Sequence, residues 1–350
     1  MVPIRYIKAK LADELDNLAA LASYPVRKQQ LLARLAASMP TLSVEATNIC
    51  NANCVFCAYQ HQERPTGVIS MGLYQKVVDE YVELGGGSLG LTPTVGDPLV
   101  DSHVLERIRY ARSKPLITSI GMFSNMISLG RVGAEPLVSS GINHLVVSVS
   151  GLDQEMYRRV YRSTRYRQVL ANIKAFATAN ITAGSPVNVE IQMRCDRPLA
   201  EVVKYPDYLE LAELIGPGKI MMKFRYDSWA GKIKQEDLIG TMKLRRWTPP
   251  RLSPCSELYS GPMVYWDGRV GACGCRDVNA SELIIGDANQ QHVGDIWFGH
   301  AIRQLRDEFM TDKIRPICAS CTHYNNVSIT LARRNREYLA GIRPVHWPIR

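Results

Sequence analysis

Cys50-Asn51-Ala52-Asn53-Cys54-Val55-Phe56-Cys57 is the stretch that most constrains the fold, because it places three cysteines at C-x3-C-x2-C spacing just after an apolar, strand-like run. Three thiolates at this spacing can hold a [4Fe-4S] cluster whose fourth iron stays open to a small molecule that binds through nitrogen and oxygen. Zinc is the alternative, but zinc sites usually close with pairs of ligands, and the nearest histidine is His61. The spacing therefore favours an iron-sulfur site.

The composition is that of a soluble globular protein. Its 350 residues suffice for one large domain and a smaller appendage, and 46% of them are hydrophobic. No apolar run approaches the roughly 20 residues needed to span a bilayer, and the N-terminal stretch carries acids that a signal peptide would lack. Most of the nine cysteines fall into close-set groups, which indicates metal binding in a reducing compartment. We therefore expect a cytoplasmic protein without a membrane partner.

The net charge of +9 is spread along the chain in several short basic runs. Because no aromatic RNA-binding motif accompanies these runs, we interpret them as solvated helix faces and do not expect a nucleic-acid partner. An acidic or phosphorylated substrate is a further, weaker inference from this charge.

Strand-like and helix-like stretches alternate from residue 41 to about residue 227. The expected strands are residues 42–46, 88–92, 117–123, 144–149, 187–193 and 220–225. The helix-like stretches between them include residues 71–84, 104–113, 166–179 and 199–214. This repeat predicts parallel strands joined by crossover helices. Residues 11–21 and 26–37 are expected to form two short helices that cap this unit.

Polar residues alternate with apolar ones along several of the expected strands. In the fifth strand the polar set is Asn188, Glu190, Gln192 and Arg194. Because alternate residues of a strand point to opposite faces, the polar face is expected to line a cavity and the apolar face to meet the helices. The pattern predicts an α/β fold in which the sheet curls into an open barrel.

A second group of cysteines comprises Cys255, Cys273, Cys318 and Cys321. Four thiolates at these spacings can surround a metal completely. Residues 265–270 contain an Asp-Gly turn typical of a β-hairpin, which would bring Cys255 and Cys273 together. Structural zinc is the main alternative here, because the group includes a Cys-x2-Cys pair.

The first motif resembles that of the radical S-adenosylmethionine (SAM) superfamily. The second group, with Gly286-Asp287 and Ile296-Trp297 between its pairs, resembles the short "twitch" form of the C-terminal SPASM extension. The resemblance implies a six-stranded partial (β/α)6 TIM barrel with its active site at the C-terminal ends of the strands, and a small twitch domain made of a β-hairpin plus a helix. The expected organisation is a helical cap at 1–40, the barrel at 41–235, the twitch domain at 250–325 and a basic tail at 326–350.

The resemblance also implies cofactors and residues that contact them. The cofactors are SAM, a SAM-binding [4Fe-4S] cluster on Cys50, Cys54 and Cys57, and an auxiliary [4Fe-4S] cluster on the second cysteine group. Asp97 stands where the family commonly has a glutamate that meets the SAM amine, and Ser148 and Arg162 correspond to residues that hold the SAM carboxylate. The full set of expected cofactor contacts is Phe56, Asp97, Ser124, Asn125, Ser148, Arg162 and Gln192.

The activity implied by the resemblance begins with reductive cleavage of SAM to a 5′-deoxyadenosyl radical, which abstracts hydrogen from the substrate. The cysteine layout is most similar to that of aminocyclitol and aminoglycoside dehydrogenases, so we expect oxidation of a secondary alcohol on a carbohydrate-like molecule. A flavodoxin or ferredoxin-type protein would supply electrons. Asp227 or Glu190 could accept the hydroxyl proton, and Arg194 or Arg225 could bind the alkoxide, although each could equally be a structural polar group.

Other functions remain open at this point. Cys195 or Cys275 could return a hydrogen atom to the substrate radical, which would make the protein an epimerase; a free cysteine is usually a small buried hydrophobe instead. A peptide-modifying radical SAM enzyme is a further alternative. The non-enzymatic alternative is a binding scaffold stabilised by zinc.

Overall fold

The computed structural model describes residues 4–245, 250–311, 313–332, 335–345 and 347. Six parallel strands follow one another across the sheet in chain order. They are β1 (Thr41–Val44), β2 (Gly87–Gly90), β3 (Ile117–Ser124), β4 (His144–Ser150), β5 (Asn188–Arg194) and β6 (Ile220–Lys223). All six expected strands are thus confirmed, with ends shifted by a few residues.

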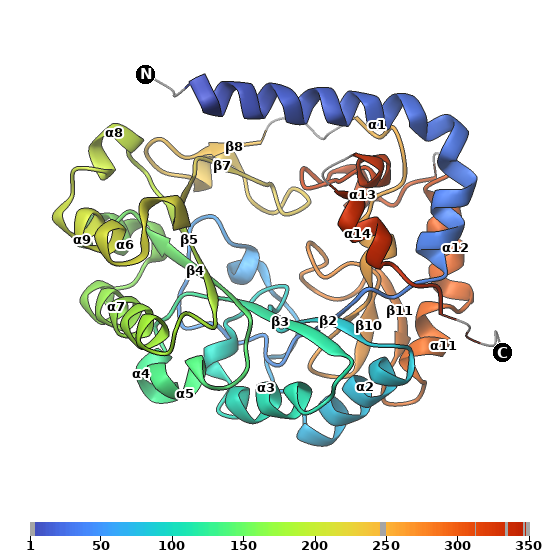
Figure 1. Ribbon diagram of the computed structural model, residues 1–350, viewed down its shortest axis with the longest axis horizontal. Helices are drawn as coiled ribbons and strands as arrows, with labels where there is room; N and C mark the ends of the chain where they lie inside the picture. Colours follow the sequence, from blue (N-terminus) through green and yellow to red (C-terminus); the bar gives the residue numbers. More distant parts are fainter. Residues whose placement is uncertain (1–3, 246–249, 312, 333–334, 346, 348–350) are drawn as a thin grey trace.

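The crossover helices run along the outer side of the curved sheet (Figure 1). They are α2 (Met71–Glu83), α3 (Val104–Arg112), α4 (Leu129–Val132), α5 (Ala134–Val138), α6 (Gln154–Tyr161), α7 (Tyr166–Thr182), α8 (Leu199–Val202) and α9 (Pro206–Ile215). The helix expected at 199–214 is divided in two. Pro206 explains the division, because proline is tolerated in the first turn of a helix but not in its interior.

The alternation of polar and apolar residues in β5 has the expected outcome. Ile191 and Met193 are fully buried in the hydrophobic core, whereas Gln192 and Arg194 face a cavity. Leu42 and Val44 of β1 are likewise fully buried. The core therefore lies between the sheet and its outer helices, and the other face of the sheet is free to carry a site.

The C-terminal strands extend the same sheet. β9 (Met263–Val264) pairs in parallel with β1, and β10 (Arg269–Gly271) and β11 (Ile284–Asp287) follow it in antiparallel order. The expected hairpin is confirmed as β9 and β10, with Gly268 at a positive φ of 94° in its turn. The result is one sheet of nine strands among the described residues, with β6 at one edge and β11 at the other.

After β6 the chain turns into a short parallel ribbon, β7 (Arg225–Tyr226) paired with β8 (Lys243–Leu244). The segment between them contains a 3-10 turn, η4 (Gln235–Asp237), where a sixth crossover helix would have stood. The remaining short elements are η1 (Ala58–His61), η2 (Pro98–Val100), η3 (Pro217–Lys219), α10 (Glu257–Ser260), α11 (Val293–Trp297), α12 (His300–Glu308), α13 (Pro316–Ala319), η5 (Val327–Leu331) and α14 (Arg336–Gly341).

The N-terminal region forms one helix, α1 (Ile4–Ala36), where two short helices were expected. Pro25 lies inside α1, and the helix bends in Figure 1. Proline removes one helical hydrogen bond and kinks a helix without always ending it, so the two expected segments merge. Arg34 of α1 donates to the backbone oxygen of Ile342 at 3.1 Å, which ties the helix to the C-terminal residues. The expected tail accordingly includes the ordered elements η5 and α14.

Within the described part of the chain, the search for a helix with the length and apolar character of a membrane span found none.

Candidate active site

Cys50, Cys54 and Cys57 lie on the loop after β1, with Cys54 buried and the other two half-buried. Burial raises the pKa of Cys50 to about 12, with a further contribution from the charge of Asp97. Burial also raises the pKa of Cys54 and of Cys57. Three thiolates in so dry a cradle require a cation beside them. The donor set therefore fits a cluster held by three cysteines.

Asp97 holds the end of β3 in place. Its carboxylate accepts hydrogen bonds from the backbone of Leu99 at 2.9 Å, from the backbone of Asn125 at 2.6 Å and from the Ser124 hydroxyl at 3.1 Å. Burial raises the pKa of this carboxyl to about 6. Its oxygens thus accept hydrogen bonds from the protein, and the expected contact of Asp97 with the SAM amine stays a prediction.

Asn125 extends this arrangement to the cysteine loop. Its side-chain amide donates to the side chain of Asn51 at 2.8 Å and lies 3.7 Å from the sulfur of Cys50. Ser124 and Asn125 therefore fix the loop against the end of β3. Their expected role as SAM contacts stays a prediction beside this role in positioning Cys50.

Ser148 and Arg162 do not meet. The Ser148 hydroxyl shares a 2.8 Å hydrogen bond with the Tyr161 hydroxyl. Arg162, in the left-handed conformation at φ 49°, donates to Gln60 at 2.9 Å and lines a separate pocket beside Cys50. The expected role of Ser148 and Arg162 in holding the SAM carboxylate stays a prediction.

A cavity of about 550 Å³ lies at the C-terminal ends of the strands. Phe56, from the first cysteine loop, forms part of its lining, and Cys275, Arg276 and His323 line it from the C-terminal region. Its size is typical of small-molecule sites. The cavity thus adjoins both cysteine groups.

Arg194 and Gln192 line the side of the cavity formed by the parallel strands. The Arg194 guanidinium lies 5.1 Å from the centre of the Phe56 ring and donates to the backbone oxygen of Gln192 at 2.9 Å. Phe56 also packs against Tyr161 and Tyr226, with ring centres 5.6 and 5.5 Å apart. The structure therefore brings Phe56, Gln192 and Arg194 together, and their expected roles as cofactor contacts and catalytic residue stay predictions. Glu190 lies outside this lining, with its carboxylate accepting from the Gln192 amide at 2.6 Å.

The second cysteine group gathers around a small apolar hollow. The cysteines that line it are Cys255, Cys273, Cys275, Cys318 and Cys321. Leu258, Leu283 and Phe309 are among the apolar residues that complete the hollow. Burial raises the pKa of Cys318 to about 12, and the charge of Cys273 adds to this shift. The four expected ligands are brought together, in surroundings that fit a buried cluster.

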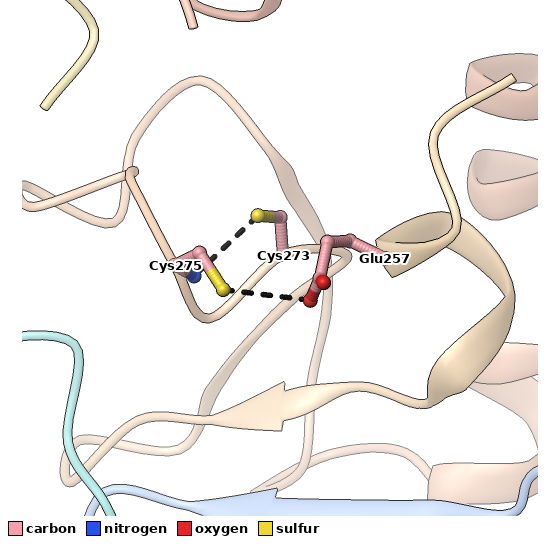
Figure 2. A group of neighbouring side chains, drawn as sticks. All are labelled: Glu257, Cys273 and Cys275. Carbon is pink, nitrogen blue, oxygen red and sulfur yellow. Dashed lines mark hydrogen bonds between the residues drawn. The ribbon is translucent and has the colours of Figure 1, made fainter. Parts of the chain in front are cut away.

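Cys275 joins this hollow to the large cavity, because it lines both. Its thiol donates to Glu257 of α10 at 3.4 Å, and its backbone N–H donates to the sulfur of Cys273 at 3.4 Å (Figure 2). The carboxylate of Glu257 and the sulfurs of Cys273 and Cys275 lie within 4.8 Å of one another, close enough to hold a metal ion together.

Cys195 has a different position. Its side chain is fully buried, it is not part of the cavity lining, and its sulfur packs near Gly151. Cys195 is the residue after the polar strand β5, and the alternation that turns Arg194 into the cavity turns Cys195 into the core. The expectation that either cysteine reaches the cavity therefore holds for Cys275 and not for Cys195.

Asp227 lines the cavity and forms an ion pair with Arg276. Its Oδ1 lies 2.7 Å from Nε of Arg276, and its Oδ2 accepts from Nη2 of the same arginine at 2.8 Å. The Arg276 guanidinium also lies 4.5 Å from the centre of the Trp229 ring, whose Nε1 donates to the backbone oxygen of Phe56 at 3.0 Å. These contacts connect the first cysteine loop to the segment that carries Cys275.

Three polar residues of the site were missed by the sequence interpretation: Glu257, Arg276 and His323. Each lies within two positions of a cysteine, which is the signal that could have identified them. Burial, with the charge of Arg276, lowers the pKa of His323 to about 4, so the imidazole is neutral at physiological pH.

Comparison with known proteins agrees with this geometry. Residues 44–191 match the radical SAM superfamily, and residues 255–322 match the SPASM iron-sulfur cluster-binding domain. The GTP 3′,8-cyclase of Pseudomonas entomophila (strain L48) is 29% identical over 166 residues, which are 47% of this chain and 49% of that protein. The enzyme of the same name from Pseudomonas putida (strain GB-1) is 28% identical over 232 residues, 64% of this chain and 66% of that protein. The chain thus spans about half to two thirds of the length of these relatives.

Two crystal structures show the same fold at low sequence identity. BtrN in complex with AdoMet and 2-DOIA is 15% identical, with a TM-score of 0.56 over 83% of this chain and 95% of that one. Streptococcus suis SuiB bound to the precursor peptide SuiA is 13% identical, with a TM-score of 0.57 over 84% of this chain and 73% of that one.

Proposed function

Because this chain belongs to the radical SAM superfamily and carries a SPASM domain after its barrel, we propose that it oxidises a secondary alcohol of a small polar molecule. The observation that supports the proposal is the single cavity lined both by Phe56, next to the first cysteine group, and by Cys275, next to the second. A substrate held there lies between the two cysteine groups.

The two matched domains imply SAM and two [4Fe-4S] clusters as cofactors. Cys50, Cys54 and Cys57 would hold one cluster, and Cys255, Cys273, Cys318 and Cys321 the other. Once bound, this cofactor set supplies a hydrogen-abstracting radical at one end of the cavity and an electron acceptor at the other.

Residues of the chain orient the substrate, exclude water and accept the hydroxyl proton. Phe56 and Arg194 form a stacked wall beside the first cysteine group, which orients the substrate and excludes water. Glu257 is placed to accept the proton of the substrate hydroxyl, because it lines the cavity and its one hydrogen-bond donor among the described residues is the weak thiol of Cys275. Asp227 suits this role less well, since Arg276 pairs with both of its oxygens.

Epimerisation is the second candidate, and the position of Cys275 favours it. The Cys275 thiol lies in the cavity lining, where it could return a hydrogen atom to the face of the substrate opposite the abstraction. Solvent deuterium in the product would support epimerisation, and its loss in a Cys275→Ala variant would identify the donor. A carbonyl product without solvent deuterium would support oxidation.

The substrate class is tested on anaerobically reconstituted protein with SAM and dithionite. Substrate-dependent 5′-deoxyadenosine is measured with an aminocyclitol, a hexose phosphate, GTP and a cysteine-containing peptide, because the names of the similar proteins cover a nucleotide and peptides. A carbonyl product from a hydroxylated small molecule would support the proposal. Stimulation by the peptide alone, or zinc in place of about eight irons, would refute it.

A further inference from the structure

Four basic residues line the side of the cavity formed by the last barrel strands and the ribbon that follows. They are Arg194 at the end of β5, Lys223 at the end of β6, Arg225 on β7 and Arg245 just after β8. The parallel pairing of β7 with β8 explains the grouping, because it sets Tyr226 beside Leu244 and lets the backbone N–H of Arg245 donate to Tyr226 at 2.7 Å. We call these four residues the basic wall.

The basic wall has no acidic partner among the residues that the structure describes. Its members form none of the ion pairs found there, and Arg194 donates only to Gln192. Among the nearby acids, Asp227 pairs with Arg276, whereas Glu257 and Glu190 accept hydrogen bonds only from neutral groups, the thiol of Cys275 and the amide of Gln192. The four positive charges of the wall therefore outnumber these two carboxylates.

The positive charges of the basic wall repel one another. Burial, with the charges of Arg194 and Arg245, lowers the pKa of Lys223, and Glu190 opposes this only in part. Like charges gathered at one cavity wall destabilise the protein until an anion lies among them. An arginine guanidinium can donate two parallel hydrogen bonds to the oxygens of a phosphoryl group. A lysine ammonium contributes a compact positive charge beside it.

We propose that the basic wall binds a phosphoryl group of the substrate. The inference rests on the proposed function only in that it concerns the same cavity. It narrows the substrate to a hydroxylated phosphate ester, such as a sugar phosphate or a nucleotide. It also disfavours a free aminocyclitol, because the ammonium groups of such a molecule would meet the same positive charge.

Binding of inorganic pyrophosphate to the reconstituted holoprotein, measured by calorimetry at low ionic strength, tests the proposal without turnover. We expect one site per chain in the wild type and affinity weakened about tenfold to a hundredfold in Lys223→Gln/Arg245→Gln. Lys243→Gln is the matched control, because Lys243 is an exposed residue on β8 that does not line the cavity. Arg225→Gln, an exposed position, tests the wall if the double variant does not fold.

Three outcomes would overturn the proposal: no pyrophosphate binding to the wild type, an equal loss in Lys243→Gln, or blockage of pyrophosphate by saturating SAM. The last would mean that the wall receives the carboxylate of SAM. Displacement of pyrophosphate by hexose phosphate or by GTP then identifies the source of the phosphoryl group. Because binding is measured without catalysis, a failure of the proposed oxidation leaves this result intact.

Discussion

The two cysteine groups are built in opposite ways. Cys50, Cys54 and Cys57 lie within eight consecutive residues on one loop, whereas the second group gathers cysteines from the segment before α10, the loop after β10 and the region of α13. The positions of the first three cysteines relative to one another are determined by their spacing on one loop. The rest of the fold only buries them. The second group exists only after distant segments have packed together. The first should therefore be lost without loss of the fold, and the second should be tied to stability.

The largest effect is expected from removing the local site. In Cys50→Ala/Cys54→Ala/Cys57→Ala, 5′-deoxyadenosine release should fall to background and iron content by about half, because one of two four-iron sites is gone. Cys195→Ala is the control, since Cys195 is a buried cysteine outside both groups. Release of 5′-deoxyadenosine by the triple variant would contradict the assignment of SAM cleavage to the first cysteine group.

Removing two cysteines of the second group should separate SAM cleavage from oxidation of the substrate. Cys318→Ser/Cys321→Ser should lose about half of the iron and all oxidised product, yet still cleave SAM. Its thermal midpoint should fall further than that of the triple variant, because metal binding at this site joins separate segments of the chain. Calorimetry of both holoproteins measures this, and an equal fall would show that the two sites contribute alike.

A smaller effect is expected where the fold supports the local site. Asp97→Asn keeps the size of the side chain but removes the charge that accepts three hydrogen bonds at the end of β3. We expect about a tenfold loss in the rate of SAM cleavage, as for a weakened hydrogen bond to a charged group. Glu106→Gln on the exposed face of α3 is the control. An unchanged rate together with full iron content would show that the loop is positioned without Asp97.

The smallest effect is expected at the contact that joins the two regions. The Thr94 hydroxyl donates to the backbone oxygen of Gly274 at 2.8 Å. Thr94→Val should cost about 1 kcal/mol of stability, the usual contribution of one hydrogen bond. Chemical denaturation measures the loss, with the exposed Thr178→Val as control. A loss no greater than in the control would mean that this contact does not help to hold the regions together.

Local patterns in the sequence predicted most of the fold and the cysteine positions. The parallel strands follow from the repeat of strand-like and helix-like stretches, the polar face of β5 follows from period-two alternation, and the hairpin follows from its Asp-Gly turn. The continuous α1 was missed because proline is usually a helix boundary, yet packing against the C-terminal residues preserves the helix.

The contacts between distant residues could not be predicted in this way. The ion pair of Asp227 with Arg276 and the hydrogen bonds of Asp97 depend on which segments meet in three dimensions. The basic wall is a further example: Arg194 and Arg225 were expected only as candidate alkoxide-binding residues, and their grouping with Lys223 and Arg245 depends on the ribbon that follows β6. Residue types thus indicated the chemistry, but the partners of each residue required the structure.

The pairing of β9 with β1 has a consequence for how the chain can be divided. A fragment ending before the C-terminal region would expose one side of β1 as an open edge, with unpaired N–H and C=O groups that invite pairing with other copies and aggregation. The barrel is therefore not an exchangeable module, and chimeras made at the boundary between the two regions would need a donated strand to close it.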